Sequence, residues 1–387
     1  MAVKPLASLK TSILEQPTIR VVKTRHDLKL FIKFPWKIYH AYPNWVPPLI
    51  VDRLKLLDRK KNPFFKHAEM ELFLAERAGE LVGRIAAIID RNYIEFHQEK
   101  VGFFGFFESV DDFEVARALL ETARSWLAER GMPKMMGPMN PSTNSEMGIL
   151  VDGFQYRPAM LMPYSPPYYG ALLERWGLQK AKDLYCYYVE KDKVLSEKLV
   201  RVAEAVRKRE KLMVRKIDMK KYKEEIALVK EIYNCAWTRN WGFVPWTDEE
   251  FDYIAKDLKQ VLVPEVNIIA EVDSKPVGFS FSLPEMGKAL QKVRNGRLLP
   301  FGIFKLLWHR RKVKFLRIVI LGVIPEYQRK GIDGVLYYET WKRGTDLGFT
   351  EGEAGWVLED NVMMIRAAEF MQATRYKTYR IYERQMD

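Results

Sequence analysis

Residues 321–339 read LGVIPEYQRKGIDGVLYYE, and they are the most informative stretch of the sequence about the fold. It begins inside an apolar run, residues 315–324, whose length and β-branched content predict a buried strand that Pro325 ends. A basic turn of residues 328–331 follows, and apolar spacing over 335–341 then predicts a helix. Because the first N–H groups of a helix have no partner within the helix, a strand, a basic turn and a helix start together favour phosphate binding.

This turn resembles the acyl-CoA-binding motif of the GNAT N-acyltransferase superfamily, which reads Gln/Arg-x-x-Gly-x-Gly/Ala. Gln328 and Gly331 occupy its first and fourth positions, whereas Asp333 stands where the family has a small residue. The resemblance implies that acyl-CoA or acetyl-CoA is the co-substrate, with its pantetheine arm along the strand and its pyrophosphate on the turn. The residues that it assigns to this cofactor site are Val323, Gln328, Arg329, Lys330, Gly331, Ile332, Asp333, Gly334 and Asn361.

The length of 387 residues predicts two domains, and the 48% hydrophobic content is enough for each to have a core. Two cysteines provide neither a disulfide framework nor a metal-binding spacing, and the five histidines are scattered. The start of the chain has no apolar signal segment, and no apolar run reaches the length of a membrane span. We therefore expect a cytoplasmic protein without a metal ion.

The chain contains two copies of one unit. Residues 44–47 and 240–245 share an Asn-Trp pair followed by Val-Pro, and residues 73–83 parallel residues 268–278, all at an offset of about 195. A similarity that keeps its spacing indicates a duplicated domain. The boundaries that it predicts are a flexible tail at 1–17, a first copy at 18–190, a helical linker at 191–212 and a second copy at 213–387.

A third matching pair, residues 104–131 and 321–348, lies at an offset of 217, so the second copy carries an insertion, placed at 287–314. Strands alternate with helices in both copies, which predicts α/β domains. The GNAT resemblance covers most of the second copy and, more faintly, the first. It implies two tandem GNAT-like domains, each with a mixed, mostly antiparallel, splayed sheet and helices on both faces.

The duplication predicts which copy binds the cofactor. At the offset of 217, the basic turn falls opposite Asp111, Asp112 and Glu114. Carboxylates suit the positive end of a helix dipole but repel a pyrophosphate. We therefore expect the first copy to have lost the phosphate turn and the second copy to bind the acyl donor.

Acyl transfer to an amine requires a group that accepts the amine proton. By resemblance, the family's usual tyrosine and glutamate fall at Ala368 and about Ile320, so both are replaced here. The catalytic candidates are Glu353 and Glu359, at the two ends of the next predicted strand. The alternative for each is an ordinary surface carboxylate.

The acceptor is expected between the copies. Loop residues 137–144 and 160–169 are rich in Pro, Asn, Ser and Tyr, a composition that suits a preformed pocket and also an ordinary rigid loop. The Asn-Trp pair of each copy offers either a pocket wall or core packing. The substrate candidates are Asn140, Asn144, Tyr164 and Trp241.

The net charge of +13 is concentrated in one segment, because residues 286–325 contain ten Lys and Arg and no acidic residue. Within it, residues 297–314 join an apolar aromatic block to a basic run. This composition favours peripheral contact with an anionic membrane, at its inner face, over nucleic acid, which is not expected because no nucleic-acid motif is present. The alternative is a helix pair that covers the sheet.

These features together predict an acyl-CoA-dependent N-acyltransferase that acts on a primary amine, either a small molecule or a lipid-type amine such as a long-chain amino alcohol. Two other functions stay open. One is a non-catalytic ligand sensor or regulator, because the usual acid–base residues are absent. The other is a transferase that uses aminoacyl-tRNA as donor, which the basic charge permits and the Gln-Arg-Lys-Gly turn disfavours.

Overall fold

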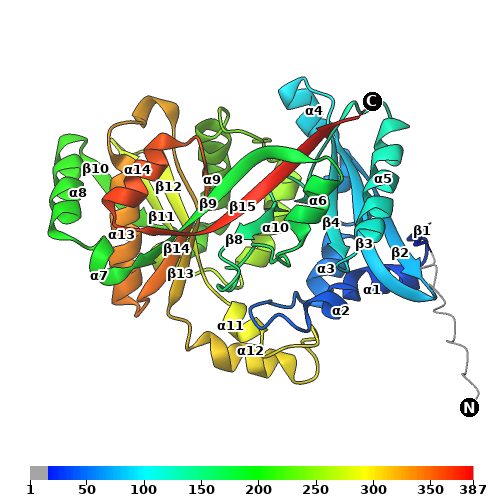
Figure 1. Ribbon diagram of the computed structural model, residues 1–387. Helices are drawn as coiled ribbons and strands as arrows, with labels where there is room; N and C mark the ends of the chain where they lie inside the picture. The colour runs from blue at the N-terminus through cyan, green and yellow to red at the C-terminus, as the bar shows by residue number, and fades with distance from the viewer. Residues whose placement is uncertain (1–15, 387) are drawn as a thin grey trace, which may run out of the picture.

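One mixed sheet of 13 strands runs through the protein, in the computed structural model of residues 16–386 (Figure 1). The predicted tail, residues 1–17, lies almost wholly outside the described residues. The strands of both copies, including the short pair β6–β7 that forms a separate sheet, are β1 (Thr18–Val21), β2 (Ala68–Arg77), β3 (Glu80–Asp90), β4 (Gly102–Ser109), β5 (Lys134–Gly137), β6 (Met139–Asn140), β7 (Glu146–Met147), β8 (Ile149–Asp152), β9 (Gln179–Glu190), β10 (Leu212–Lys216), β11 (Ile268–Val272), β12 (Lys275–Pro284), β13 (Phe315–Val323), β14 (Glu351–Leu358) and β15 (Thr374–Gln385).

The α-helices connect these strands and cover the sheet. They are α1 (Arg25–Lys33), α2 (Pro35–Tyr39), α3 (Ile50–Leu56), α4 (Arg91–His97), α5 (Phe113–Ala128), α6 (Tyr169–Arg175), α7 (Lys191–Val194), α8 (Glu197–Arg209), α9 (Tyr222–Ala236), α10 (Asp248–Leu258), α11 (Gly287–Leu290), α12 (Gly302–Arg310), α13 (Ile332–Asp346) and α14 (Val362–Phe370). Four 3-10 turns complete the described elements: Pro63–Lys66, Met219–Lys221, Pro264–Val266 and Pro325–Tyr327.

The strand order shows the duplication directly. From one edge it reads β1-β2-β3-β4-β5-β15, and from the other edge β10-β11-β12-β13-β14-β9. Strands β9 and β15 lie beside each other, so the last strand of each copy joins the sheet of the other copy. Figure 1 shows both as long ribbons that cross the middle of the molecule. This exchange joins the two copies into one continuous sheet. The domain boundaries inferred from the sequence remain a prediction.

Amphipathic helices cover both faces of each half. In the first half, α5 packs on β2, β3 and β4 and buries Leu119, Ala123 and Leu127. In the second half, α13 packs on β11, β12 and β13 with Trp341 fully buried, and α9 contacts β12 and β13. The mixed, mostly antiparallel sheet with helices on both faces confirms the predicted fold class.

Each half contains one pair of neighbouring parallel strands that diverge. Strands β13 and β14 pair only from Phe315 to Ile318, and β4 and β5 pair only at Gly102 and Phe103. Beyond these residues the two strands of each pair separate, so the sheet opens into a splay in each half of the molecule. An irregularity in the pairing of β12 with β13 leaves Val319 without a partner in β12, as a β-bulge does.

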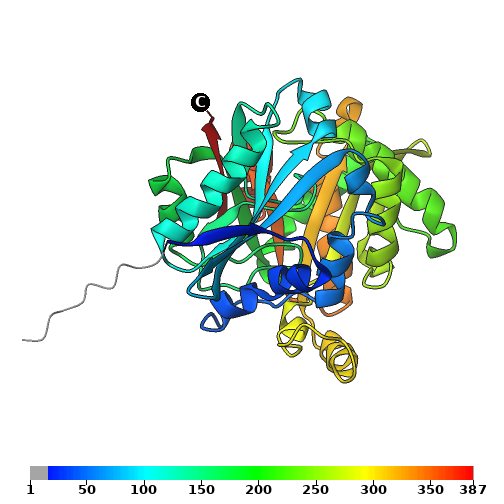
Figure 2. The same cartoon turned by 90° about the vertical axis from the view of Figure 1, so that its right-hand side faces the viewer.

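The predicted insertion contains α11 and α12, which project below the sheet in Figure 1 and again in Figure 2. The base of this projection is fastened to the first copy. Trp36 Nε1 donates to the Arg294 carbonyl at 2.6 Å, and the Ile50 N–H donates to the Gly296 carbonyl at 2.9 Å. Among the described helices, none is long and apolar enough to cross a bilayer.

Candidate active site

The basic turn after β13 has the geometry of an anion-binding loop. Arg329 and Gly331 adopt positive φ angles of 62° and 84°, and α13 begins at Ile332 without a side-chain cap. Within the described residues, the backbone N–H groups of residues 329–334 donate no hydrogen bond. Several unpaired N–H groups therefore lie at the positive end of a 15-residue helix.

Neighbouring elements hold this turn in place. Gln328 Nε2 donates to the Val323 carbonyl at 3.0 Å, which closes the turn on the end of β13. Arg209 of α8 donates to the Lys330 carbonyl at 2.6 Å. A Cβ atom at Gly331 would lie 3.0 Å from Val206 of the same helix, so the turn approaches α8 too closely for a larger residue in this conformation.

A cavity of about 1190 Å³ extends from this turn into the molecule. One part follows the open splay, with residues 319–323 on one wall and residues 356–358 on the other. The cavity continues between the two copies, where apolar side chains from α3, α9, α10 and α12 surround it. A single space therefore joins the basic turn, the splay and the interface between the copies.

The predicted cofactor residues divide into two groups around this cavity. Those that line it are Val323, Gln328, Arg329, Gly331, Asp333 and Asn361. Lys330 lies in the turn and Ile332 and Gly334 follow it, and none of the three lines the cavity. Asn361 is also the N-cap of α14, where its side-chain oxygen accepts from the Met364 N–H at 3.2 Å.

Glu353 is fully buried behind the cavity wall, in a cluster with Arg317, Lys377 and Tyr376. The Lys377 ammonium lies 2.7 Å from one carboxylate oxygen, and Arg317 Nε lies 3.4 Å from the other. Burial opposes the charged form, but Lys377 and Arg317 outweigh it and lower the pKa of Glu353. Its carboxylate therefore stays ionised and is a weak proton acceptor, so its catalytic role stays a prediction.

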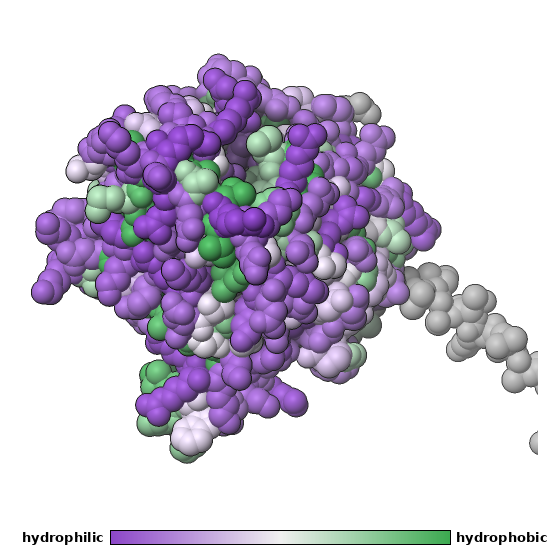
Figure 3. Space-filling view, turned by 90° about the vertical axis from the view of Figure 1, so that its left-hand side faces the viewer, coloured by the Kyte–Doolittle hydropathy of each residue, from purple (hydrophilic) through white to green (hydrophobic). Residues whose placement is uncertain are grey.

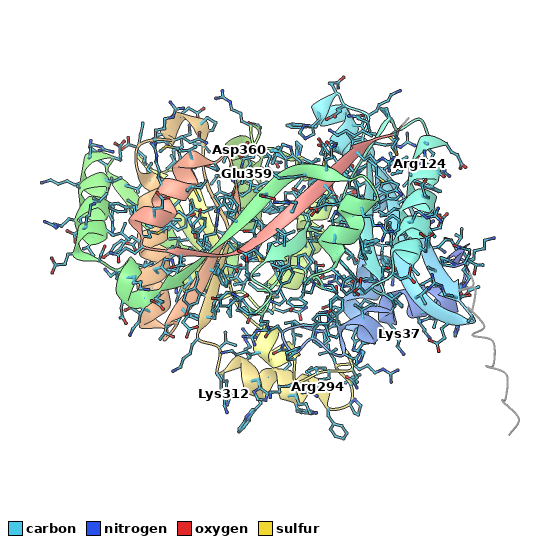
Figure 4. All side chains as sticks on the ribbon, viewed as in Figure 1. Lys37, Arg124, Arg294, Lys312, Glu359 and Asp360 are labelled. Carbon is cyan, nitrogen blue, oxygen red and sulfur yellow. The ribbon has the colours of Figure 1, made fainter. Side chains whose placement is uncertain are left out.

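Glu359 lies outside the cavity, near the exit of β14. It receives a hydrogen bond from the Lys180 ammonium at 2.6 Å and one from the Asp183 N–H at 3.1 Å. Figure 4 shows Glu359 and Asp360 together beside β9, well away from Arg294 and Lys312 on the projecting segment. The structure therefore does not bring the two predicted catalytic carboxylates together.

Glu285 is the carboxylate that the sequence analysis overlooks. It follows the last residue of β12 and lines the cavity, although only 5% of its surface is exposed. Burial raises the pKa of Glu285, and Arg157, with Nε at 3.7 Å, only partly opposes this effect. A carboxylate with a raised pKa in a largely apolar cavity is a stronger proton acceptor than an ordinary glutamate.

Three of the four predicted substrate residues line the cavity: Asn140, Asn144 and Trp241. Both asparagines also hold the structure together. Asn140 accepts from the Phe106 N–H at 2.6 Å, while Asn144 donates to the Val244 carbonyl at 2.9 Å and accepts from the Tyr233 hydroxyl at 3.0 Å. Tyr164 lies outside this cavity and donates to the Phe154 carbonyl at 2.9 Å.

Arg317 is a second residue that the sequence analysis overlooks. It lines the cavity and donates to the carbonyls of Met160 and Gly355. A charged residue inside an apolar strand was the only signal for it. No local signal distinguishes Glu285 from an ordinary acid at a strand end, because the charged groups near it, Arg157 of the first copy and Lys377 of the second, are distant in sequence. Among the described residues, no group of three or more His, Cys, Asp and Glu side chains could hold a metal ion.

No protein-family model matches the chain. The structure resembles a tandem GNAT protein from the clavulanic acid biosynthesis pathway, with a TM-score of 0.57, 11% identity, and coverage of 96% of this chain and 99% of that one. It also resembles a GCN5-related N-acetyltransferase from Sphaerobacter thermophilus, with a TM-score of 0.53, 12% identity and 96% of both chains covered. The fold is that of tandem GNAT proteins.

Two curated proteins are similar along almost the whole chain. "Bacterial ceramide synthase" of Caulobacter vibrioides is 39% identical over 373 residues, which cover 94% of this chain and 96% of that protein. "Protein YghO" of Escherichia coli K12 is 36% identical over 378 residues, with 96% of both covered. The chain belongs to the family of these two proteins, it has the GNAT fold, and it is an acyltransferase.

Proposed function

We propose that the protein is an N-acyltransferase that moves a long acyl group from acyl-CoA to the primary amine of a lipid, such as a long-chain amino alcohol. The observation that carries this proposal is the single cavity of about 1190 Å³ that joins the phosphate turn to an apolar chamber. Its volume exceeds the roughly 300–1,000 Å³ of common ligand sites, which suits two long hydrocarbon chains. The name of the relative from Caulobacter, a ceramide synthase, supports the same substrate class.

The donor end fits acyl-CoA. The unpaired N–H groups of residues 329–334 would hold the pyrophosphate, and the Arg329 side chain would add positive charge. The free edge of β13 at residues 319–323 would pair with the amide groups of the pantetheine arm. Asp333 is the unfavourable feature, because its carboxylate also lines this end of the cavity.

The acceptor end fits a lipid amine. Its wall is largely apolar, with Leu298, Leu306 and Leu307 from the insertion and Tyr253 and Leu258 from α10. A long-chain acceptor also requires the enzyme to approach a lipid surface, so we include a cytoplasmic location at the inner face of the membrane in this proposal. Residues 297–314 are the candidate contact.

The reaction forms a C–N bond between the amine and the thioester carbonyl and breaks the C–S bond to CoA. The amine is an ammonium ion at neutral pH and must lose a proton before it attacks. We assign this proton to Glu285, the buried carboxylate in the cavity wall. The nitrogen loses a second proton as the amide forms, and the departing CoA thiolate ends as a thiol.

Calorimetric titration with acyl-CoA molecules of increasing chain length tests the donor site. Affinity that rises with chain length supports an apolar acyl channel. Equal affinity for all lengths indicates acetyl-CoA and a small soluble amine, and absence of binding contradicts the proposal. Salt-dependent binding of tRNA in its place would favour the aminoacyl-tRNA donor, and acyl-CoA binding without turnover would favour a sensor.

A second experiment tests Glu285, with mass-spectrometric detection of the amide formed from a long-chain amino alcohol. We expect Glu285→Gln to lower kcat about 100-fold without weakening acyl-CoA binding, because it removes only the proton acceptor. The matched control is Asp52→Asn, another carboxylate that lines the cavity and whose pKa burial also raises. Equal loss in both variants would contradict a specific role for Glu285.

The pH dependence of the reaction rate tests the role of Glu285 independently. Because the pKa of Glu285 is raised, the rate of the wild-type enzyme should start to fall at a higher pH than an ordinary glutamate would give, as the carboxyl group becomes protonated. The Gln variant should lack this acidic limb. An unchanged profile in the variant would assign the limb to another group.

A further inference from the structure

We propose that the projecting segment, residues 297–314, docks on an anionic lipid bilayer and sets the mouth of the cavity on the membrane surface. The entry route for a lipid substrate rests on the proposed function, whereas the docking itself does not. The argument uses the exposure of α12, its two apolar sides and its charge.

Large apolar side chains on this segment face solvent. Leu299 is 75% exposed, Phe301 71%, Phe304 68% and Trp308 65%. Six of the fifteen large apolar side chains that are exposed in the described chain fall within residues 299–308. Contiguous exposed apolar groups of this size mark an interaction site, since single exposed residues would be scattered.

The helix α12 is apolar on two sides, and only one of them has a partner within the described residues. Ile303, Leu306 and Leu307 line the cavity, whereas Phe301, Phe304 and Trp308 do not. The second group is spaced three and four residues apart and therefore forms one outward face of the helix. A helix that is apolar around most of its circumference needs a second apolar environment.

The charge around this face indicates which environment it is. The insertion carries eight exposed basic residues, none of which forms a salt bridge within the described residues: Lys288, Lys292, Arg294, Arg297, Lys305, Arg311, Lys312 and Lys314. Aromatic side chains next to Lys and Arg are the composition with which a helix lies in the interface of an anionic bilayer. Figure 3 shows this projection with hydrophobic and hydrophilic surface side by side, and Figure 4 labels Arg294 and Lys312 there.

The same segment forms part of the cavity mouth. Ile303 and Leu307 line the cavity and are also 38% and 52% exposed, so the cavity reaches the outside surface at α12. The projection is fastened at its base, where Gln291 donates to the carbonyls of Pro43 and Trp45 at 3.0 Å each. Docking of the outward face would therefore hold the mouth at the level of the lipids, and a long-chain amine could pass from the bilayer into the cavity without crossing water.

Vesicle flotation tests the docking with the full chain. The probes are vesicles of phosphatidylcholine alone and vesicles that also contain phosphatidylglycerol. We expect binding to the anionic vesicles, weakened by salt, and little binding to the neutral ones. The variant Phe301→Ser with Phe304→Ser and Trp308→Ser should bind anionic vesicles at least about tenfold more weakly.

The matched control replaces three exposed apolar residues elsewhere: Val202→Ser, Met213→Ser and Leu347→Ser. We expect this control to bind vesicles like the wild-type chain. Wild-type protein that ignores anionic vesicles, or equal binding by both triple variants, would overturn the proposal. A dimer that forms without lipid and dissociates in the α12 variant would assign the face to a second copy of the chain and would also overturn it.

Assays of acyl transfer distinguish the membrane-docking proposal from the proposed acyltransferase function. The α12 variant should still bind acyl-CoA and acylate a short-chain amine in solution, but lose turnover of a long-chain amine supplied in anionic vesicles. Vesicle binding without any acyl transfer would leave docking intact and refute the acyltransferase proposal. Equal turnover of the vesicle-bound amine by the variant would refute the entry route.

Discussion

The two copies use the same strand–turn–helix unit for different purposes. After β13, Gly331 at a positive φ begins α13 with unpaired N–H groups. After β4, Asp112 begins α5 and accepts from the N–H groups of Glu114 and Val115. One helix start is free to bind an external anion, whereas the other already holds a carboxylate of its own chain.

The splays differ in the same way. The splay between β13 and β14 opens into the cavity. In the first copy, Asn140 accepts from the Phe106 N–H at 2.6 Å, and a Cβ at Gly105 would lie 1.7 Å from the Met139 carbonyl oxygen. Met139 and Asn140 of the chain itself therefore fill the splay between β4 and β5. A duplicated fold can keep its sheet and lose a ligand site when nearby backbone occupies the opening.

The largest effect is expected at the paired glycines Gly105 and Gly322, which match at the offset of 217. Gly105→Ala should lower the free energy of unfolding by about 3 kcal/mol or more, because a backbone carbonyl cannot move aside. Gly322→Ala, whose nearest contact is the Trp237 side chain at 3.0 Å, should cost about 1 kcal/mol. Urea denaturation checks both, and equal losses would contradict a filled first splay.

The next largest effect is expected when the basic turn after β13 is given negative charge like that of the turn after β4. Arg329→Glu with Lys330→Glu should weaken acyl-CoA binding at least about 100-fold, because two repulsive charges replace two attractive ones. Calorimetry measures the affinity, and thermal unfolding checks that the fold survives. The control, Lys275→Glu with Lys342→Glu, has the same net charge, so unchanged binding in the first variant would place the pyrophosphate elsewhere.

The acids at the ends of β3 and β12 also differ. Glu285 lines the cavity, but Asp90, which matches it at the offset of 195, lies 3.0 Å from His67 Nδ1. Burial lowers the pKa of His67, but Asp90, and Glu250 at 3.2 Å, raise it to about 9. The folded-state value exceeds the unfolded one, so this stabilisation is complete below the unfolded pKa near 6.5 and is lost as the pH rises through 9.

We therefore expect the free energy of unfolding to fall by about 2 kcal/mol between these pH values. Denaturation at several pH values measures the change. In His67→Gln this part of the pH dependence should disappear. If the variant keeps the wild-type slope, another group causes it.

The smallest effect is expected when the first copy receives a basic turn residue. Asp111→Arg should leave the stoichiometry of acyl-CoA at one per chain, because the filled splay gives the pantetheine arm no edge to bind. Stability should change by less than about 0.5 kcal/mol, since Asp111 is exposed. Calorimetry measures the number of acyl-CoA molecules bound per chain. A value of two would show that charge alone prevents the first copy from binding acyl-CoA.

Much of the fold could be predicted because the signals are local. The duplication, the strand at residues 315–324, the basic turn and the start of α13 all depend on spacing along the chain, and the structure contains these elements. The exchange of β9 and β15 could not be predicted. A strand has the same sequence pattern whichever copy supplies its neighbours, so its partner is decided by contacts that are distant in sequence.

In the candidate active site, too, some parts have local sequence signals and others depend on distant contacts. The basic turn and the start of the helix after it could be located from the sequence alone, because a helix start and its charges are set by neighbouring residues. The sequence indicated Asn140, Asn144, Tyr164 and Trp241 as substrate candidates, and all but Tyr164 line the cavity. It indicated Glu353 and Glu359 as catalytic candidates and did not point to Glu285. Only the tertiary structure decided that Glu353 is enclosed by Lys377 and Arg317 and that Glu285 lines the cavity, since burial and charge partners come from both copies.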